Sequence, residues 1–229
     1  MPKPTKPHIS VNKLAEFNEA KGARQRQILH IQKYPTGFTG LYHKEAAEAI
    51  ARTLASHLED LSPIEKAISL LEQAKPAKIG TQRRVAANID ALESFSLLLD
   101  KIEPLIKDVD LVLGDQFNAQ RLTIHGVDIN VRPELLTRRN GKTGPLCGAV
   151  KLHFPTTFPL NKVSAGIVSA VTQEWCKQYT PGKGKVSGPL CFVVDVASQE
   201  VYDGVSSTVA RIRDVEADCQ NIAALWPSI

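Results

Sequence analysis

Apolar side chains recur at helical spacing through the first half of the chain. Val85, Ile89, Leu92, Phe95 and Leu99 stand three or four residues apart, as on one face of an amphipathic helix. Ser10 and Ser62 stand where helix N-caps belong, and Pro104 stands where a helix bends or ends. These patterns predict helices over residues 11–32, 41–58, 62–75 and 81–106.

The spacing changes near residue 108, where short β-prone segments begin. Residues 127–131 alternate apolar and polar side chains, as a half-buried strand does. Asn140-Gly141 predicts a hairpin turn, and the apolar run over residues 190–196 predicts a central strand buried on both faces. The other strands are predicted at 109–113, 121–125, 148–154 and 200–202, with helices over 162–179 and from 206 onward.

The two patterns together predict an α+β fold, with a helical N-terminal half and a small mixed β-sheet with flanking helices. We expect residues 1–9 to be a flexible tail and residues 10–107 to be mainly helical. Residues 108–229 then form the α/β core, which we expect to pack with the helical region as one domain.

Composition places this fold in the cytoplasm. The chain has 229 residues, of which 43% are hydrophobic, and no apolar run approaches the roughly 20 residues of a membrane span. Its N-terminus is basic and proline-rich and lacks the apolar stretch of a signal peptide. The four cysteines form no C-x-x-C pair, which favours free thiols in a reducing compartment. We therefore expect a cytoplasmic protein with no membrane partner.

Charge is spread unevenly along the chain. Residues 119–190 carry 10 basic and 3 acidic side chains, a net charge of +7, whereas residues 191–229 carry 2 and 6. Clustered Lys and Arg attract polyanions, so the basic stretch predicts a nucleic-acid partner. On charge alone, a solvated basic face is the more common explanation.

The basic stretch also contains a candidate catalytic pair. A predicted strand with Asp128 leads into Pro133-Glu134, and the strand after the hairpin carries Lys151 at its centre. Carboxylates bind Mg²⁺ or Mn²⁺, and a lysine can stabilise the charge that develops on a phosphate. Two neighbouring strands bearing these groups would suit metal-dependent phosphodiester cleavage. A lysine on a strand is more often solvated or paired with a cross-strand carboxylate.

Here the chain resembles the PD-(D/E)XK nuclease superfamily. Pro133-Glu134 is similar to the family's proline-acid pair, and Ala149-Val150-Lys151 is similar to its acid-x-Lys element. The resemblance covers roughly residues 108–200 and implies an αβββαβ core. It also implies that the protein cleaves DNA with Mg²⁺ or Mn²⁺, with Glu134 and Lys151 as catalytic residues.

The sequence departs from the family pattern at Ala149, which stands in place of the second acid and cannot bind metal. Some family members place that carboxylate on a neighbouring helix, which makes Glu174 the first candidate here and Asp128 the second. Gly40-Leu41-Tyr42-His43 is similar to a glycine-histidine element in which the histidine binds metal. The expected metal ligands are therefore Asp128, Glu134, Glu174 and His43.

Two alternatives remain open beside the nuclease. The first is an inactive nuclease-fold protein that binds nucleic acid, motivated by Ala149. The second is a protein-interaction subunit that uses the helical half, because residues 1–118 carry 16 basic and 15 acidic side chains and are almost neutral. For either nucleic-acid function the expected contacts to phosphate are Arg132, Arg138, Arg139 and Lys142.

Overall fold

The computed structural model describes residues 6–35, 42–115, 119–180 and 182–229, and it has an α+β fold. Its α-helices are α1 (Val11–Glu19), α2 (Ala23–Lys33), α3 (Lys44–Ala55), α4 (Ser62–Gln73), α5 (Ile79–Ser96), α6 (Leu99–Ile106), α7 (Lys162–Tyr179) and α8 (Val209–Leu225). Its strands are β1 (His8–Ser10), β2 (Asp110–Leu113), β3 (Leu122–Ile124), β4 (Val127–Asn130), β5 (Leu135–Gly141), β6 (Gly144–His153), β7 (Lys185–Val186), β8 (Val193–Asp195) and β9 (Glu200–Tyr202). The described residues also include the 3₁₀ turns η2 (Gly188–Leu190) and η3 (Trp226–Ser228).

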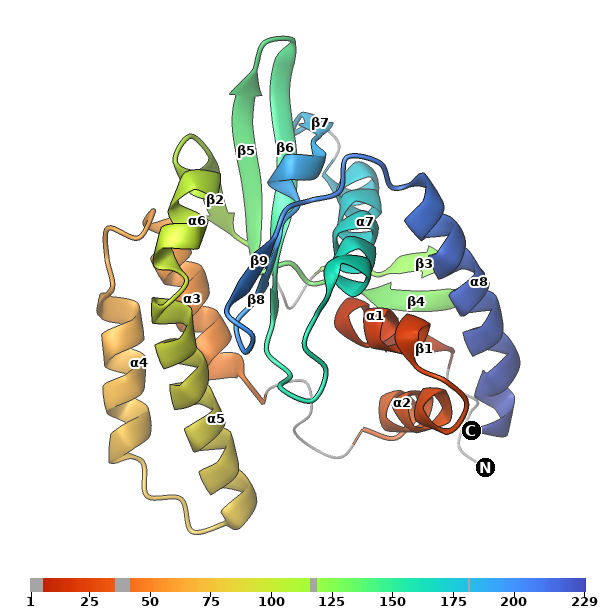
Figure 1. The fold of residues 1–229 in the computed structure, drawn as a ribbon, viewed down its shortest axis with the longest axis horizontal. Helices are drawn as coiled ribbons and strands as arrows, with labels where there is room; N and C mark the ends of the chain where they lie inside the picture. The colour runs from red at the N-terminus through yellow and green to blue at the C-terminus, as the bar shows by residue number, and fades with distance from the viewer. Residues whose placement is uncertain (1–5, 36–41, 116–118, 181) are drawn as a thin grey trace.

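A mixed sheet runs through the middle of the molecule in the order β2-β5-β6-β8-β9, with the short β7 also beside β6 (Figure 1). The β2–β5, β5–β6 and β8–β9 pairs are antiparallel, whereas β6 and β8 are parallel. A parallel pair needs a crossover between its strands, and α7 is part of the connection that supplies it. Along the sequence, three strands of this sheet (β2, β5 and β6) are therefore followed by helix α7, then by β8 and β9.

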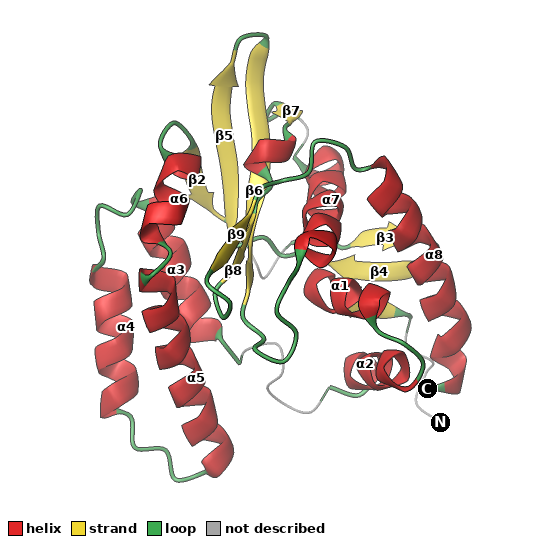
Figure 2. Cartoon of the chain, viewed as in Figure 1, coloured by secondary structure: helices red, strands yellow, loops and turns green. Residues whose placement is uncertain are grey.

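Helices α3 to α6 cover one face of the sheet (Figure 2). Alternate residues of the strands, among them Leu135, Val150, Leu152 and Val194, point into a buried cluster with their apolar side chains. This cluster joins the predicted helical region to the sheet in one continuous core.

Helix α7 packs against the opposite face of the sheet, and α1, α8 and a second, three-stranded sheet in the order β1-β4-β3 complete the core on that side (Figure 2). Ala149 and Val193 contribute to this core from the main sheet, and Ile9 and Ile129 contribute from the second. Helix α7 is buried along most of its length because it lies between the two sheets and α1. The main sheet thus separates two cores.

Most predicted elements are confirmed, including the helix over residues 162–179 and the hairpin of β5 and β6. The predicted helix over residues 11–32 is broken, because Gly22 adopts a φ of +45° between α1 and α2. The helix predicted from residue 41 begins at Lys44, and residues 36–41 lie outside the described residues. The 81–106 helix is interrupted between α5 and α6.

Two predictions about the start of the chain and the sheet are wrong. Residues 8 and 9 are not a tail, because β1 pairs in parallel with β4 and Ile9 is fully buried. The strand that carries Asp128 is not beside the strand that carries Lys151, because β4 pairs with β1 and β3 instead. In the part of the chain that the structure describes, no helix has the length and apolar character of a transmembrane segment.

Candidate functional site

Glu134 and Lys151 form a buried ion pair on the face of the sheet that packs against α1 and α7. The Lys151 Nζ atom lies 2.7 Å from Glu134 Oε1, and the residues are only 8% and 6% exposed. The second carboxylate oxygen, Oε2, accepts a hydrogen bond of 2.8 Å from the backbone N–H of Leu152. The structure therefore brings these two predicted residues together, because the observed β5–β6 register sets residue 134 opposite residue 151.

The backbone before β5 holds this pair in place. Lys151 Nζ also donates to the Arg132 carbonyl oxygen at 2.9 Å. The backbone of Arg132 has a φ of +44°, a value that residues other than glycine rarely adopt. The Gly114 N–H donates to the Glu134 carbonyl, and a Cβ added at Gly114 would lie 2.1 Å from the Pro133 oxygen. This close approach requires glycine and fixes the start of β5.

The pair is fully engaged with groups of the protein itself. Both oxygens of Glu134 accept hydrogen bonds, and Lys151 divides its donors between Glu134 and Arg132. A buried ion pair of this kind avoids the large cost of an unpaired charge in an apolar environment. As it stands, the arrangement neutralises two charges and ties β6 to the segment before β5.

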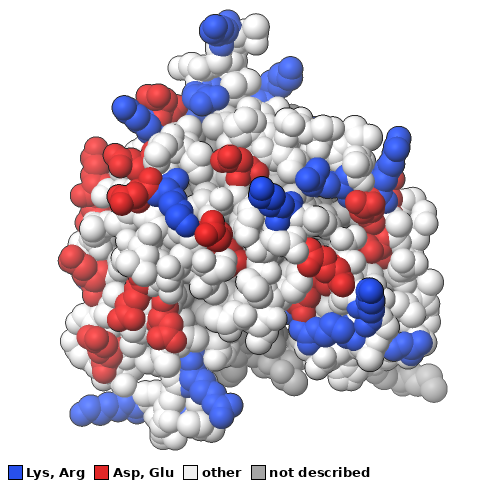
Figure 3. Space-filling view, viewed as in Figure 1, with Lys and Arg blue, Asp and Glu red and all other residues white. Residues whose placement is uncertain are grey.

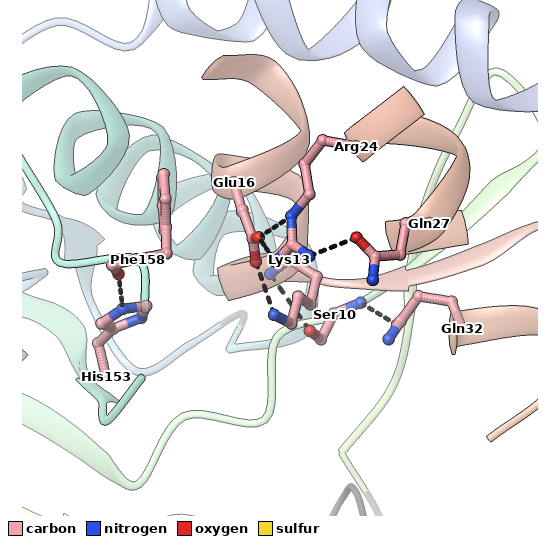
Figure 4. A network of polar contacts seen from close by, with 8 residues as sticks. All are labelled: Ser10, Lys13, Glu16, Arg24, Gln27, Gln32, His153 and Phe158. Carbon is pink, nitrogen blue, oxygen red and sulfur yellow. Dashed lines mark hydrogen bonds and ion pairs between the residues drawn. The ribbon is translucent and has the colours of Figure 1, made fainter. Parts of the chain in front are cut away.

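A second polar network joins α1 and α2 beside the end of β6 (Figure 4). Glu16 is 4% exposed and accepts hydrogen bonds from Lys13 and Arg24. Burial alone would raise the pKa of Glu16, but the hydrogen bonds from Lys13 and Arg24 outweigh it, and the pKa is lowered. Glu16 is thus held as a carboxylate that links the two helices.

His153 and Asp195 face the same side of the sheet at the ends of β6 and β8, where they are register partners. The Phe158 carbonyl accepts from His153 Nε2 at 2.7 Å, so that nitrogen carries the proton. Burial lowers the pKa of His153, which keeps the ring neutral, and its Nδ1 atom has no hydrogen-bond partner in the described chain. Asp195 accepts from the Leu160 N–H at 2.7 Å and from Ser198, so this buried acid has partners.

The other predicted metal ligands lie elsewhere. Asp128 lies in the second sheet, and its carboxylate accepts from Lys6 and Thr123. Burial alone would raise the pKa of Asp128, but the bonds from Lys6 and Thr123 lower it. Glu174 on α7 pairs with Lys177 at 2.6 Å and accepts from Thr208.

His43 precedes α3 and stacks on Phe154, with 4.9 Å between the ring centroids. Phe154 packs with the α3–α6 core, on the face of the sheet opposite Lys151. Burial lowers the pKa of His43. Gly40 and Leu41, which belong to the same predicted element, lie outside the described residues.

These positions test whether the side chains fit a magnesium or manganese ion. Such an ion takes several oxygen ligands, from one or two carboxylates that are free to bind it and from waters or phosphates. Here Glu134 stands beside Lys151, and Ala149 supplies no oxygen ligand from its side chain. Among the described residues, no three His, Cys, Asp or Glu side chains gather in a group that could hold a metal ion. The donor set as placed does not fit this ion.

The other end of the β5–β6 hairpin projects from the body of the molecule (Figure 1). We call residues 138–146 the arm; they begin at the last residue of β5 that pairs with β2. Arg138, Arg139 and Lys142 are exposed on the arm, as predicted for residues that contact phosphate. Arg132 is also exposed, but it precedes the opposite end of β5 and is not part of the arm.

Two further lysines join the arm from a distant part of the sequence. β7 pairs with β6 so that Lys185 stands beside Leu146, and Lys183 lines a pocket of about 380 Å³. The pocket's other lining residues are Asp110, Arg138, Arg139, Asn140, Pro145 and Gly182. None of the five cations forms an ion pair within the described chain.

Lys183 and Lys185 stand in the segment Gly182-Lys183-Gly184-Lys185, and nothing local in the sequence places that segment beside the arm. The signal would have been the length of β6, which pairs with β8 only at Lys151–His153 and leaves the same edge open for β7 at Leu146 and Cys147. Figure 3 shows Lys and Arg at the projecting end of the molecule and many acidic side chains over the helices below it. The arm and β7 therefore form one basic surface.

A scan of the chain against protein-family models finds no match, and a search of curated proteins finds none either.

Proposed function

We propose that this protein binds nucleic acid through the arm and β7, on a core similar to that of the PD-(D/E)XK nucleases. One observation carries the proposal: five cations gather at a projecting hairpin with no ion-pair partner in the described chain. Exposed Lys and Arg that are not neutralised by the protein are available to the phosphates of a nucleic acid, and they release its counterions.

The core supports the proposal in a second way. The sequence order β2, β5, β6, α7, β8 follows the αβββαβ order that the resemblance implies, with the leading helix from α3–α6. Glu134 and Lys151 are the two residues that the resemblance assigns to catalysis, but the described donor set around them lacks a second carboxylate. Binding without cleavage is the function that these two facts favour together.

The test compares two variants of equal charge. Arg138→Ala/Arg139→Ala/Lys142→Ala removes three cations from the arm, and Lys75→Ala/Lys78→Ala/Arg83→Ala removes three exposed cations near the α4–α5 connection. Binding to a labelled DNA duplex is followed by fluorescence anisotropy between about 50 and 200 mM salt. We expect the arm variant to lose about tenfold or more in affinity and its salt slope to fall by about 3.

The control variant is expected to bind nearly as the parent does, because the α4–α5 connection lies at the opposite end of the molecule (Figure 1). Equal loss in both variants would mean that binding follows net charge alone. An unchanged arm variant would overturn the proposal.

A metal-dependent deoxyribonuclease is the second candidate, favoured by the Glu134–Lys151 contact directly after Pro133. The parent is incubated with single- and double-stranded DNA and Mg²⁺ or Mn²⁺, beside folded Glu134→Gln and Lys151→Arg variants. Cleavage that is lost in both variants would establish this candidate over the binding protein. A parent that binds DNA and cleaves neither substrate would remove it.

We also propose the reducing cytoplasm as the compartment, because all four cysteines are buried free thiols.

A parent protein that neither binds nor cleaves DNA would leave the protein-interaction subunit as the remaining candidate, with the helical half as its binding surface.

A further inference from the structure

We infer that the arm enters the major groove of duplex DNA, where its two faces contact the phosphates of both strands. This inference rests on the proposed function and specifies its partner: a double-stranded DNA rather than a single strand or an RNA duplex. It follows from three properties of the arm, namely its length, the distribution of its cations and its lack of aromatic side chains.

The arm has the dimensions of a groove-binding ribbon. Two residue pairs, Asn140 with Pro145 and Gly141 with Gly144, extend past both the last β2 pair and the last β7 pair. At about 3.3 Å per residue, these pairs and the Lys142-Thr143 turn beyond them project about 10 Å. The major groove of B-form DNA is about 8.5 Å deep and about 12 Å wide, and it admits a two-stranded ribbon.

Cations leave the arm on both of its faces. Leu136 packs toward the α1–α7 core, so Arg138, two residues later, belongs to that face. The Thr137 hydroxyl donates to the Leu190 carbonyl on the other side of the sheet, so Arg139 belongs to the other face. The segment that contains β7 adds one lysine to each face.

Lys183 belongs to the first face because it lines a pocket there with Leu136 and Tyr179, and it shares a second pocket with Asp110, Arg138 and Arg139. On the second face, Arg139, Leu146 and Lys185 are register partners in a row across β5, β6 and β7, so their side chains leave the sheet on the same side. A single strand passing along the arm would meet one of these faces. The two walls of a duplex groove carry one phosphate backbone each, so a ribbon inserted between them uses both.

The chemistry of the arm disfavours other nucleic acids. Residues 135–152 contain no Phe, Tyr or Trp, and neither do residues 182–187. Proteins that bind single strands usually stack bases on aromatic side chains, and this surface offers none. The major groove of an RNA duplex is deep and too narrow for side chains to read. Duplex DNA is the partner that remains.

The first experiment measures binding of the parent to a short DNA duplex, to each of its strands and to an RNA duplex of the same sequence. We expect the DNA duplex to bind at least about tenfold tighter than the others. Equal or tighter binding to a single strand or to RNA would overturn the inference, while the proposed function would stand if the arm variant still lost affinity.

The second experiment tests the two faces separately. Duplexes carry neutral methylphosphonate linkages in one strand, in the other, or in neither, and they are titrated with the parent and two variants. Arg138→Ala/Lys183→Ala removes cations from the first face, and Arg139→Ala/Lys185→Ala removes them from the second. We expect either modified strand to weaken binding by the parent, and each variant to lose sensitivity to only one of them.

A parent that responds to one strand alone would show that the arm lies along a single backbone, and the insertion would be wrong. If neither face variant loses affinity and the arm variant binds as the parent does, the proposed function itself is overturned. The two failures are therefore distinguishable.

Discussion

Charged side chains lie at both ends of the β5–β6 hairpin. They are buried and paired at one end and exposed at the other. At the inner end, Glu134 and Lys151 are buried and bonded to each other. At the outer end, Arg138, Arg139 and Lys142 are exposed and have no ion-pair partner within the described residues. The buried pair has no net charge and little contact with solvent, whereas the cations of the arm are accessible to an anion from outside.

The difference shows why residue type alone is a poor guide to function. A lysine in the middle of a strand and an arginine near its tip are both basic residues in the sequence. Burial makes the first depend on its carboxylate, because an unpaired charge in the core is very costly. Exposure leaves the second hydrated and available to an anion from outside. Predictions about the two ends should therefore separate stability from binding.

The largest effect is expected from breaking the buried pair. Glu134→Ala leaves Lys151 without its carboxylate and should reduce the free energy of unfolding by about 3–5 kcal/mol. Glu134→Leu/Lys151→Met, which removes both charges at similar volume, should cost much less. Urea unfolding measures both variants. Equal losses in the two would show that the pair matters through its shape and not through its charge.

A smaller effect is expected from the titration of His153. Because burial lowers the pKa of His153 in the folded state, the unfolded chain takes up its proton first as the pH falls below about 6.5. Stability from this group is complete above that value and declines below it, by at most about 1.4 kcal/mol per pH unit. The His153→Gln variant keeps a donor for Phe158 and should flatten the decline.

Unfolding curves of the parent and of this variant between about pH 7.5 and 5 would measure that slope. His43, whose pKa burial also lowers, provides the matched comparison through His43→Gln. A slope unchanged in both variants would place the acid sensitivity in other groups.

The smallest effect on stability is expected at the outer end. The arm variant Arg138→Ala/Arg139→Ala/Lys142→Ala removes exposed side chains that make no ion pairs in the described chain. Each change should alter the free energy of unfolding by less than about 0.5 kcal/mol. A thermal melt of this variant beside the parent measures it. A large loss would mean that the arm packs against the body, which would contradict its role as a free surface.

Local patterns were sufficient for much of the fold. The apolar stripe of residues 162–179 predicted α7, and the Asn140-Gly141 signal predicted the hairpin, although the two-residue turn is Lys142-Thr143. These elements are determined by near neighbours in the chain. The hairpin register decides which residues face each other, and a turn at Asn140-Gly141 would have set Glu134 opposite Cys147; the turn two residues later is what sets Glu134 opposite Lys151.

Contacts between distant segments could not be predicted in this way. β4 alternates as a strand should, but nothing local indicates that its partner is β1 rather than β6. For that reason Asp128 was expected near Lys151. The network of Glu16, Lys13 and Arg24 was missed because it depends on how α1 and α2 meet, and on Gly22 between them.

The pairing of β1 with β4 has a consequence for how the chain reaches its native state. His8 is the register partner of Asp128, 120 positions later, so the β1 strand has no place to dock while the chain is short. Helix α1 cannot be buried before then either, because it packs on α7 and α8, and α2 packs on α1 and β1. On a ribosome, the α3–α5 helices have their main partners in one another and can pack early, whereas the β1–α2 segment, which is synthesised before them, is buried later.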